Sequence, residues 1–122
     1  MSEFFIKQAF AEAIDLQKNQ KYDEAKKLYE KILQRDSKDA NARHLIALIY
    51  MAEGNFNEAK KNIEIAIDQA PDQPIFHSNY GALLHSMGKH KEAVVALEKS
   101  IKLDDKLFQS YYSLGIAYSD LN

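Results

Sequence analysis

The sequence contains no cysteine and no tryptophan, and only two prolines and four glycines occur among its 122 residues. Without cysteine the chain has no disulfide bond, no thiolate metal ligand and no thiol nucleophile. Its longest apolar run, residues 45–52, is far shorter than the roughly 20 residues that a membrane-spanning helix needs. The first residues also lack the basic and then apolar regions of a signal peptide. We therefore expect no membrane segment and a cytoplasmic location.

The chain also has little excess of charge of either sign. The chain has 16 Lys and Arg against 18 Asp and Glu, which gives a net charge of −2, and Lys and Glu alternate along it without blocks. A nucleic-acid surface needs clustered Lys and Arg. The charge pattern therefore predicts no nucleic-acid partner.

The residue types that carry chemistry form no recognisable site. The four histidines, His44, His77, His85 and His90, show no metal-ligand spacing along one helix face. Packing is the favoured interpretation for His77 and His90, which fall in core or turn registers. The carboxylates are scattered, and no Gly-rich phosphate loop is present. We expect no metal, no cofactor and no catalytic activity.

What the sequence does contain is a Glu-Ala pair that returns every 34 residues, at Glu24, Glu58 and Glu92. A ring-bearing residue precedes each pair at the same distance (Tyr22, Phe56 and His90). A fixed period in the range of about 20–50 residues is typical of stacked supersecondary units. The period predicts one domain, residues 1–122, with repeats at about 6–39, 40–73 and 74–107 and a half repeat at 108–122.

Each full repeat predicts two helices. In the second repeat, apolar residues recur at helical spacing at Ala42, Leu45, Ile46, Ile49 and Tyr50. The pattern breaks at Gly54, and Gly88 and Gln20 hold the same place in the third and first repeats. Glycine suits this place because it reaches positive φ without a Cβ penalty. No strand pattern competes, so we expect an all-α chain with about seven helices.

Small and large residues also alternate in phase with the repeat. We expect the first helix of each repeat to cross the second closely at four small residues, Ala13, Ala47, Gly81 and Gly115. The large set, expected to fill the space beyond, is Tyr29, Ile63 and Leu97. Such alternation lets facing helices interdigitate.

With these features in register, the chain resembles a tetratricopeptide repeat (TPR) protein from about Ile6 to Asn122. The second repeat carries the resemblance best, with Tyr50, Gly54, Phe56, Ala59, Ala66 and Pro71. The chain departs from the pattern at Glu12, Ile32 and Ser100. The resemblance implies an α-α superhelix whose first helices line a concave groove, and hence a protein–protein interaction scaffold that binds a peptide or helix of a partner.

The register then predicts which side chains line that groove: Phe10, Ile14, His44, Leu45, Leu48, Met51, Asn79, Ala82, His85, Tyr112 and Ile116. The first half of the groove is apolar (Phe10, Ile14, Leu45, Leu48 and Met51), and the second half is polar, with small hydroxyls, Asn79 and His85. An exposed apolar patch tends to mark an interaction surface. Asn79 is a candidate to hydrogen-bond a ligand backbone, with a simply solvated side chain as the alternative. Filling of the groove by residues 1–5 or by a second copy stays open.

One well-known use of this family, the carboxylate clamp for chaperone C-termini, needs Lys, Arg and Asn at five places. Those places hold Phe10, Ile14, Leu45, Ile75 and Asn79. Shifted by one repeat, they hold His44, Leu48, Asn79, Gln109 and Ser113. No Lys or Arg can pair a carboxylate in either frame, so we expect no binding of chaperone tails.

The last predicted helix has an apolar face formed by Tyr111, Leu114, Tyr118 and Leu121. The chain stops at Asn122, in the register of a turn, before a second helix that would cover this face. Either the chain is part of a longer array, or another copy covers the face and makes a homo-oligomer.

Two alternatives to a peptide-binding scaffold therefore stay open. One is an N-terminal substrate-recruiting segment of a larger enzyme, such as a bacterial glycosyltransferase. The other is a self-assembling structural oligomer. RNA binding by the related 35-residue repeats is disfavoured by the 34-residue period and the mild acidity.

Overall fold

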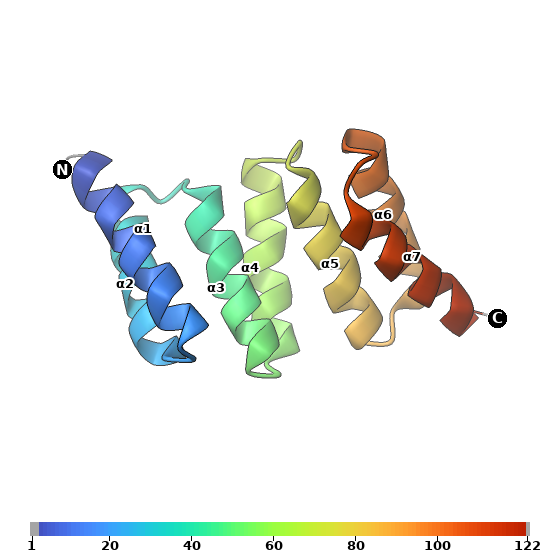
Figure 1. Cartoon of the computed structure of the whole chain (residues 1–122), viewed down its shortest axis with the longest axis horizontal. Helices are drawn as coiled ribbons and strands as arrows, with labels where there is room; N and C mark the ends of the chain where they lie inside the picture. Colours follow the sequence, from blue (N-terminus) through green and yellow to red (C-terminus); the bar gives the residue numbers. More distant parts are fainter. Residues whose placement is uncertain (1–2, 122) are drawn as a thin grey trace. The chain divides into compact units, whose positions relative to one another are not determined.

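The computed structural model describes residues 3–121, which form seven α-helices and no strand (Figure 1). They are α1 (Glu3–Lys18), α2 (Tyr22–Arg35), α3 (Ala40–Ala52), α4 (Phe56–Gln69), α5 (Pro74–Ser86), α6 (His90–Leu103) and α7 (Phe108–Leu121). The prediction of an all-α chain with about seven helices is confirmed. The expectations for Met1, Ser2 and Asn122 lie outside the described residues.

The helices divide into two compact units. The N-terminal unit, Met1–Gln69, holds α1 to α4, and the C-terminal unit, Ala70–Asn122, holds α5 to α7. Each of the three predicted repeats contains one helix pair, and α7 lies in the half repeat. The boundary of a single domain over residues 1–122 stays a prediction.

The turn inside each repeat has the same left-handed backbone, as predicted. The φ angles are 77° at Gly54, 79° at Gly88 and 62° at Gln20. A residue with a Cβ in this region costs roughly 1–2 kcal/mol, so Gln20 keeps the turn at some expense of stability. In all three turns the next amide donates to a carbonyl five residues back at 2.8 Å, which closes the preceding helix.

The starts of two helices also follow from the sequence. The Oδ1 atom of Asp39 accepts a hydrogen bond from the amide of Ala42 at 3.1 Å and so caps α3. Pro74 opens α5, where its missing N–H and fixed φ do no harm. Both residues fix where the first helix of a repeat begins.

Tyr29 is the largest fully buried side chain in the core of the N-terminal unit. That core consists of Ala9, Ala13, Ala25, Tyr29, Ile32, Ala42, Ile46 and Ile49. The Oη atom of Tyr29 donates a hydrogen bond to Oε1 of Gln17 at 2.8 Å. Its ring lies 6.1 Å from that of Phe10, centroid to centroid. Burial raises the pKa of Tyr29 to about 12, so the phenol remains a donor at neutral pH and joins α2 to α1.

The core of the C-terminal unit shows why one position in the repeat must be small. A Cβ atom on Gly81 would lie 2.5 Å from Cγ of the buried Leu97, so α5 and α6 cross closely there. This confirms the predicted close crossing in the third repeat. The same addition at Gly115 on α7 would meet nothing within 4 Å.

Ser100, which replaces the alanine usual for the family, is fully buried and hydrogen-bonded. Its Oγ donates to the carbonyl of Pro74 at 2.8 Å and lies 2.9 Å from Oγ of Ser110. The departure from the family pattern therefore supplies polar contacts that join the beginnings of α5 and α7 to the end of α6. Within the described residues, no helix has the length and apolar character needed to cross a membrane.

Candidate functional site

The predicted apolar surface of the N-terminal unit lies on α1 and α3. Ile14 on α1 is 37% exposed, whereas Leu45, Leu48 and Met51 on α3 are half-buried. Phe10 and Leu45 also pack against the core of this unit. These side chains are therefore partly packed against the core and partly exposed to solvent.

His44, also predicted for the groove, is a core residue in the structure. Its side chain is only 6% exposed. Burial lowers the pKa of His44 to about 4, because the charged imidazolium is poorly solvated there. His44 is consequently neutral at physiological pH and offers little surface to a ligand.

In the C-terminal unit, the predicted residues of α5 and α7 meet at a small hollow. Ala82 and His85 of α5 and Ile116 of α7 line it together with Ser86 and Ser113, and its volume is about 190 Å³. The lining combines the apolar side chains of Ala82 and Ile116 with two hydroxyls and an imidazole. That the second half of the groove is a polar binding surface stays a prediction.

Asn79 and Tyr112 lie outside that hollow. Asn79 is half-buried, and its Oδ1 accepts a hydrogen bond from Nε2 of Gln109 at 3.3 Å. The same Gln109 nitrogen donates to Oγ of Ser78 at 2.9 Å. Tyr112 is 64% exposed and its ring stacks on that of Phe108 at 6.5 Å. The amide of Asn79 therefore already has a partner within the chain.

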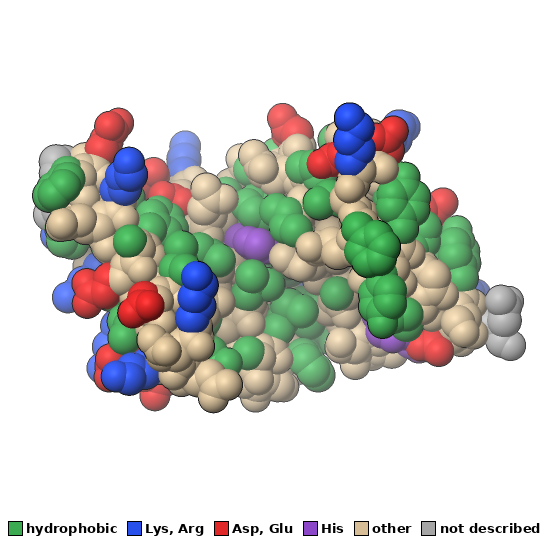
Figure 2. All heavy atoms as spheres, viewed as in Figure 1, with side chains coloured by type: hydrophobic (Ala, Val, Ile, Leu, Met, Phe, Trp, Pro, Cys, Tyr) green, Lys and Arg blue, Asp and Glu red, His purple; other side chains and the backbone are tan. Residues whose placement is uncertain are grey.

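Hydrophobic side chains gather over α7, as Figure 2 shows. Tyr111, Tyr118 and Leu121 are 47%, 45% and 41% exposed. Leu114, the fourth member of the predicted self-association face, is half-buried and packs against the core of the C-terminal unit. Three of the four predicted residues are thus open to solvent.

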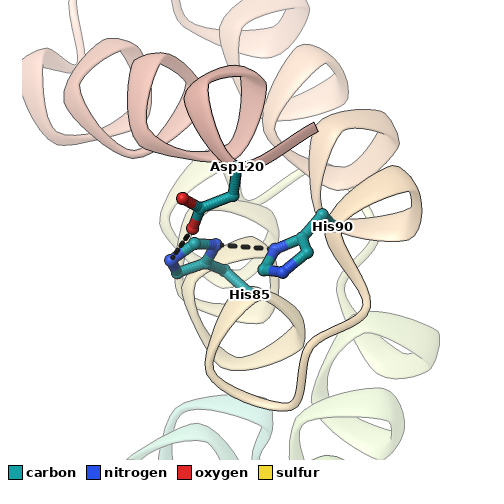
Figure 3. Close-up of side chains that lie close together, drawn as sticks. All are labelled: His85, His90 and Asp120. Carbon is teal, nitrogen blue, oxygen red and sulfur yellow. Dashed lines mark hydrogen bonds and ion pairs between the residues drawn. The ribbon is translucent and has the colours of Figure 1, made fainter. Parts of the chain in front are cut away.

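The structure also brings together three residues that the sequence did not connect (Figure 3). Nδ1 of His85 lies 3.0 Å from Nδ1 of His90, and Nε2 of His85 lies 3.3 Å from Oδ2 of Asp120. A search along single helix faces misses this cluster because α5, α6 and α7 supply one residue each. The available signal was the period: Asp120 follows His85 by one residue more than a repeat.

These features define a helical-repeat protein with exposed apolar and polar surfaces on the first helices of its repeats. Residues 16–83, more than half of the chain, match the family described as tetratricopeptide repeat, and residues 81–122 match one described as TPR repeat. The chain belongs to the tetratricopeptide repeat family. The family assignment made from the sequence is thereby confirmed.

Two curated proteins contain similar stretches. Mouse DnaJ homolog subfamily C member 7 is 29% identical over 72 residues, which are 59% of this chain and 15% of that protein. The Caenorhabditis elegans protein O-mannosyl-transferase F38B6.6 is 36% identical over 61 residues, 50% of this chain and 9% of that protein. The matched stretches thus span less than a sixth of these relatives.

Solved structures show the same fold at low sequence identity. The first TPR of Spaghetti (RPAP3), bound to the HSP90 peptide SRMEEVD, superposes with a TM-score of 0.91 at 21% identity, covering 99% of this chain and 96% of that one. The Yersinia enterocolitica type III secretion chaperone SycD, in complex with a peptide of the translocator YopD, gives 0.87 at 16% identity, covering 99% and 98%. At these identities the similarity establishes the fold.

Proposed function

We propose that this chain is a protein–protein interaction scaffold that binds a peptide or helix of a partner on the first helices of its repeats. The observation that carries the proposal is the apolar surface of α1 and α3, in which Ile14 of α1 is 37% exposed and Leu45, Leu48 and Met51 of α3 are half-buried. Exposed apolar surface on a folded domain favours association, and the flexible thioether of methionine adapts to differing partners. No reacting group is required for this function.

The family similarity supports the same proposal. Spaghetti (RPAP3) and SycD, which share the fold, were each solved with a bound peptide. For this chain we propose a ligand with apolar anchors, because the five clamp places hold no Lys or Arg in either frame. A peptide that relies on its carboxylates would find no bidentate partner there.

Replacing Leu48 with glutamate is expected to weaken peptide binding about 10- to 100-fold. Burying one leucine side chain contributes about 1.5–3 kcal/mol, and about 1.4 kcal/mol corresponds to a factor of ten in Kd. The probe is a peptide selected on the wild-type chain from a random library, and its affinity is measured by fluorescence anisotropy. Selected peptides should carry several apolar residues.

Two further variants make this experiment decisive. Ile14→Glu changes a more exposed member of the same surface and should weaken binding with unchanged helicity. Ile65→Glu places the same charge on an equally exposed residue of α4, 40% accessible, and should leave the affinity unchanged. Failure to select any peptide, or full affinity in both Leu48→Glu and Ile14→Glu, would contradict the proposal.

The exposed face of α7 supports a second role, the association of two copies of the chain. Tyr111, Tyr118 and Leu121 form this face on one side of the helix, next to the anchored Leu114. Aromatic residues with a polar tip are frequent in interfaces because they bury large area at low entropic cost. We propose that a second copy covers this face.

The Tyr118→Ser variant is expected to lower the molar mass seen by light scattering at high protein concentration, because it removes a ring from the α7 face. Tyr112→Ser removes a ring of the same kind from another face of the same helix and should leave the mass unchanged. A wild-type chain that stays monomeric over the whole concentration range would contradict self-association.

The similarity to part of an O-mannosyl-transferase favours one alternative, a substrate-recruiting segment of a larger enzyme. The peptide-binding surface would then select the substrate rather than a regulatory partner. The coding sequence that follows residue 122 distinguishes the two. The cytoplasmic location expected from the sequence stays a prediction.

A further inference from the structure

The cluster of His85, His90 and Asp120 is not required by the repeat. The positions equivalent to His85 are Gln17 in the first repeat and Met51 in the second. The positions equivalent to His90 are Tyr22 and Phe56. The first two repeats pack with amide, thioether, phenol and phenyl side chains at these positions, so the fold does not need imidazoles there. The coincidence of two histidines and a carboxylate, with ligand atoms all within 4.8 Å of one another, calls for a separate explanation.

Hydrogen bonding fixes the proton of His85 on one nitrogen. A carboxylate only accepts, so Nε2 of His85, 3.3 Å from Oδ2 of Asp120, carries the proton. A neutral His85 then presents a lone pair at Nδ1, directed at Nδ1 of His90 3.0 Å away. An imidazole oriented by a carboxylate on its outer nitrogen is the arrangement that proteins use to direct histidine ligands at metals.

The spacing of the two Nδ1 atoms suits a shared cation. Two zinc–nitrogen bonds of about 2.0–2.1 Å at a tetrahedral angle place their nitrogens about 3.3 Å apart. The observed separation of 3.0 Å is a few tenths of an ångström shorter, and the ion lies off the line between the two nitrogens. Both rings must therefore turn their Nδ1 lone pairs toward the ion as they move apart. His85 and His90 flank the turn between α5 and α6 and are half-buried, so rotation of their side chains is the movement that binding requires.

We propose that His85 and His90 bind one divalent cation of the zinc class through their Nδ1 atoms, with Asp120 as the positioning residue of His85. Imidazole nitrogen suits Zn²⁺ and its neighbours rather than Mg²⁺ or Ca²⁺, which prefer oxygen. On binding, the ion replaces the proton that lies between the two Nδ1 atoms. His90 takes a proton at Nε2 from solvent as it releases the one at Nδ1, so both rings stay neutral.

Such an ion would join the turn between α5 and α6 to the last turn of α7 through Asp120. It would therefore stabilise the position of α7 within the C-terminal unit. Water would complete its coordination, because the side chain of Asp120 is 48% exposed and that of His85 27%. The inference does not depend on peptide binding by α1 and α3.

The test is a titration of the untagged full chain with ZnCl₂ at about pH 7.5, where an ordinary imidazole is neutral, followed by calorimetry. We expect one Zn²⁺ per chain. His85→Gln and His90→Phe, which install residues that the chain already uses at these places, should each weaken binding about 100-fold or more. Asp120→Asn should weaken it about 10- to 100-fold, as for other outer-shell partners.

Two variants serve as matched controls. His77→Gln removes a histidine of the same unit whose Nε2 already contacts the carbonyl of Pro71 at 2.7 Å. Asp105→Asn removes an exposed carboxylate of the same unit away from the cluster. Both should keep wild-type affinity for Zn²⁺.

Nitrogen NMR of the wild-type imidazoles gives a readout that needs no variant. Zn²⁺ should shift the Nδ1 resonances of His85 and His90 and move the proton of His90 to Nε2. The imidazole nitrogen resonances of His44 and His77 should not shift. The proposal is overturned if Zn²⁺ does not bind below about 1 mM, or if binding survives His85→Gln or His90→Phe. Full affinity in Asp120→Asn would remove the positioning role.

Discussion

Tyr29→Ala is expected to lower the free energy of unfolding by about 3–5 kcal/mol, the range for truncating a large buried aromatic side chain. Tyr29 is fully buried in the core of the N-terminal unit, which also contains Ala13, Ala25 and Ile32, so the change leaves a cavity in that core. It also removes the ring that supports Phe10 at 6.1 Å. Urea unfolding followed by circular dichroism measures the loss.

Tyr29→Phe separates packing from hydrogen bonding. It keeps the ring but removes the bond from Oη to Oε1 of Gln17, and should cost only about 1 kcal/mol. The two variants should therefore differ by about 2–4 kcal/mol, most of it from the cavity. Equal losses in both variants would mean that the hydrogen bond rather than the ring holds α1 against α2.

Acidification should destabilise the chain through His44. The pKa of His44 is about 4 in the folded state and about 6.5 when unfolded. Between these values the unfolded state binds more protons, so stability is full above about pH 6.5 and falls as the pH drops towards about 4. At about 1.4 kcal/mol for each pH unit, the loss reaches about 3 kcal/mol.

His44→Phe isolates this effect from the carboxylates that titrate in the same range. Phenylalanine occupies the equivalent place in the first repeat, as Phe10, and has no proton to gain. We expect the difference in unfolding free energy between wild type and variant to change by about 3 kcal/mol between about pH 7 and pH 4. A difference that stays constant with pH would contradict the burial of His44 as a neutral ring.

Both predictions concern the support of the proposed binding surface. The ring of Tyr29 lies near that of Phe10. His44 is a buried residue of α3, the helix that also carries partly exposed residues of the surface. Loss of either residue should therefore weaken peptide binding indirectly, through the position of α1 or α3, whereas Leu48→Glu acts at the surface itself. Measuring stability and affinity for each variant distinguishes the two effects.

Much of the candidate surface was accessible to sequence reasoning because it depends on register. A period of 34 residues, once found, assigns Ile14 and Leu48 to first helices, and the structure leaves both partly open. The same reasoning assigned His44 to this surface, yet the structure buries it. The packing of the adjacent helix decides how exposed each position is, so His44 is 6% exposed while its neighbour Leu45 is half-buried. The period of the sequence does not predict this difference.

The sequence by itself determined the seven helices, the turns at Gln20, Gly54 and Gly88, and the need for a small residue at Gly81. These features follow from local backbone preference and from a spacing that repeats, so they can be read without knowing contacts. The tertiary structure alone decided that Asn79 pairs with Gln109 and that His85, His90 and Asp120 meet. Those contacts join side chains from different helices, and separations of a few tenths of an ångström decide whether they form.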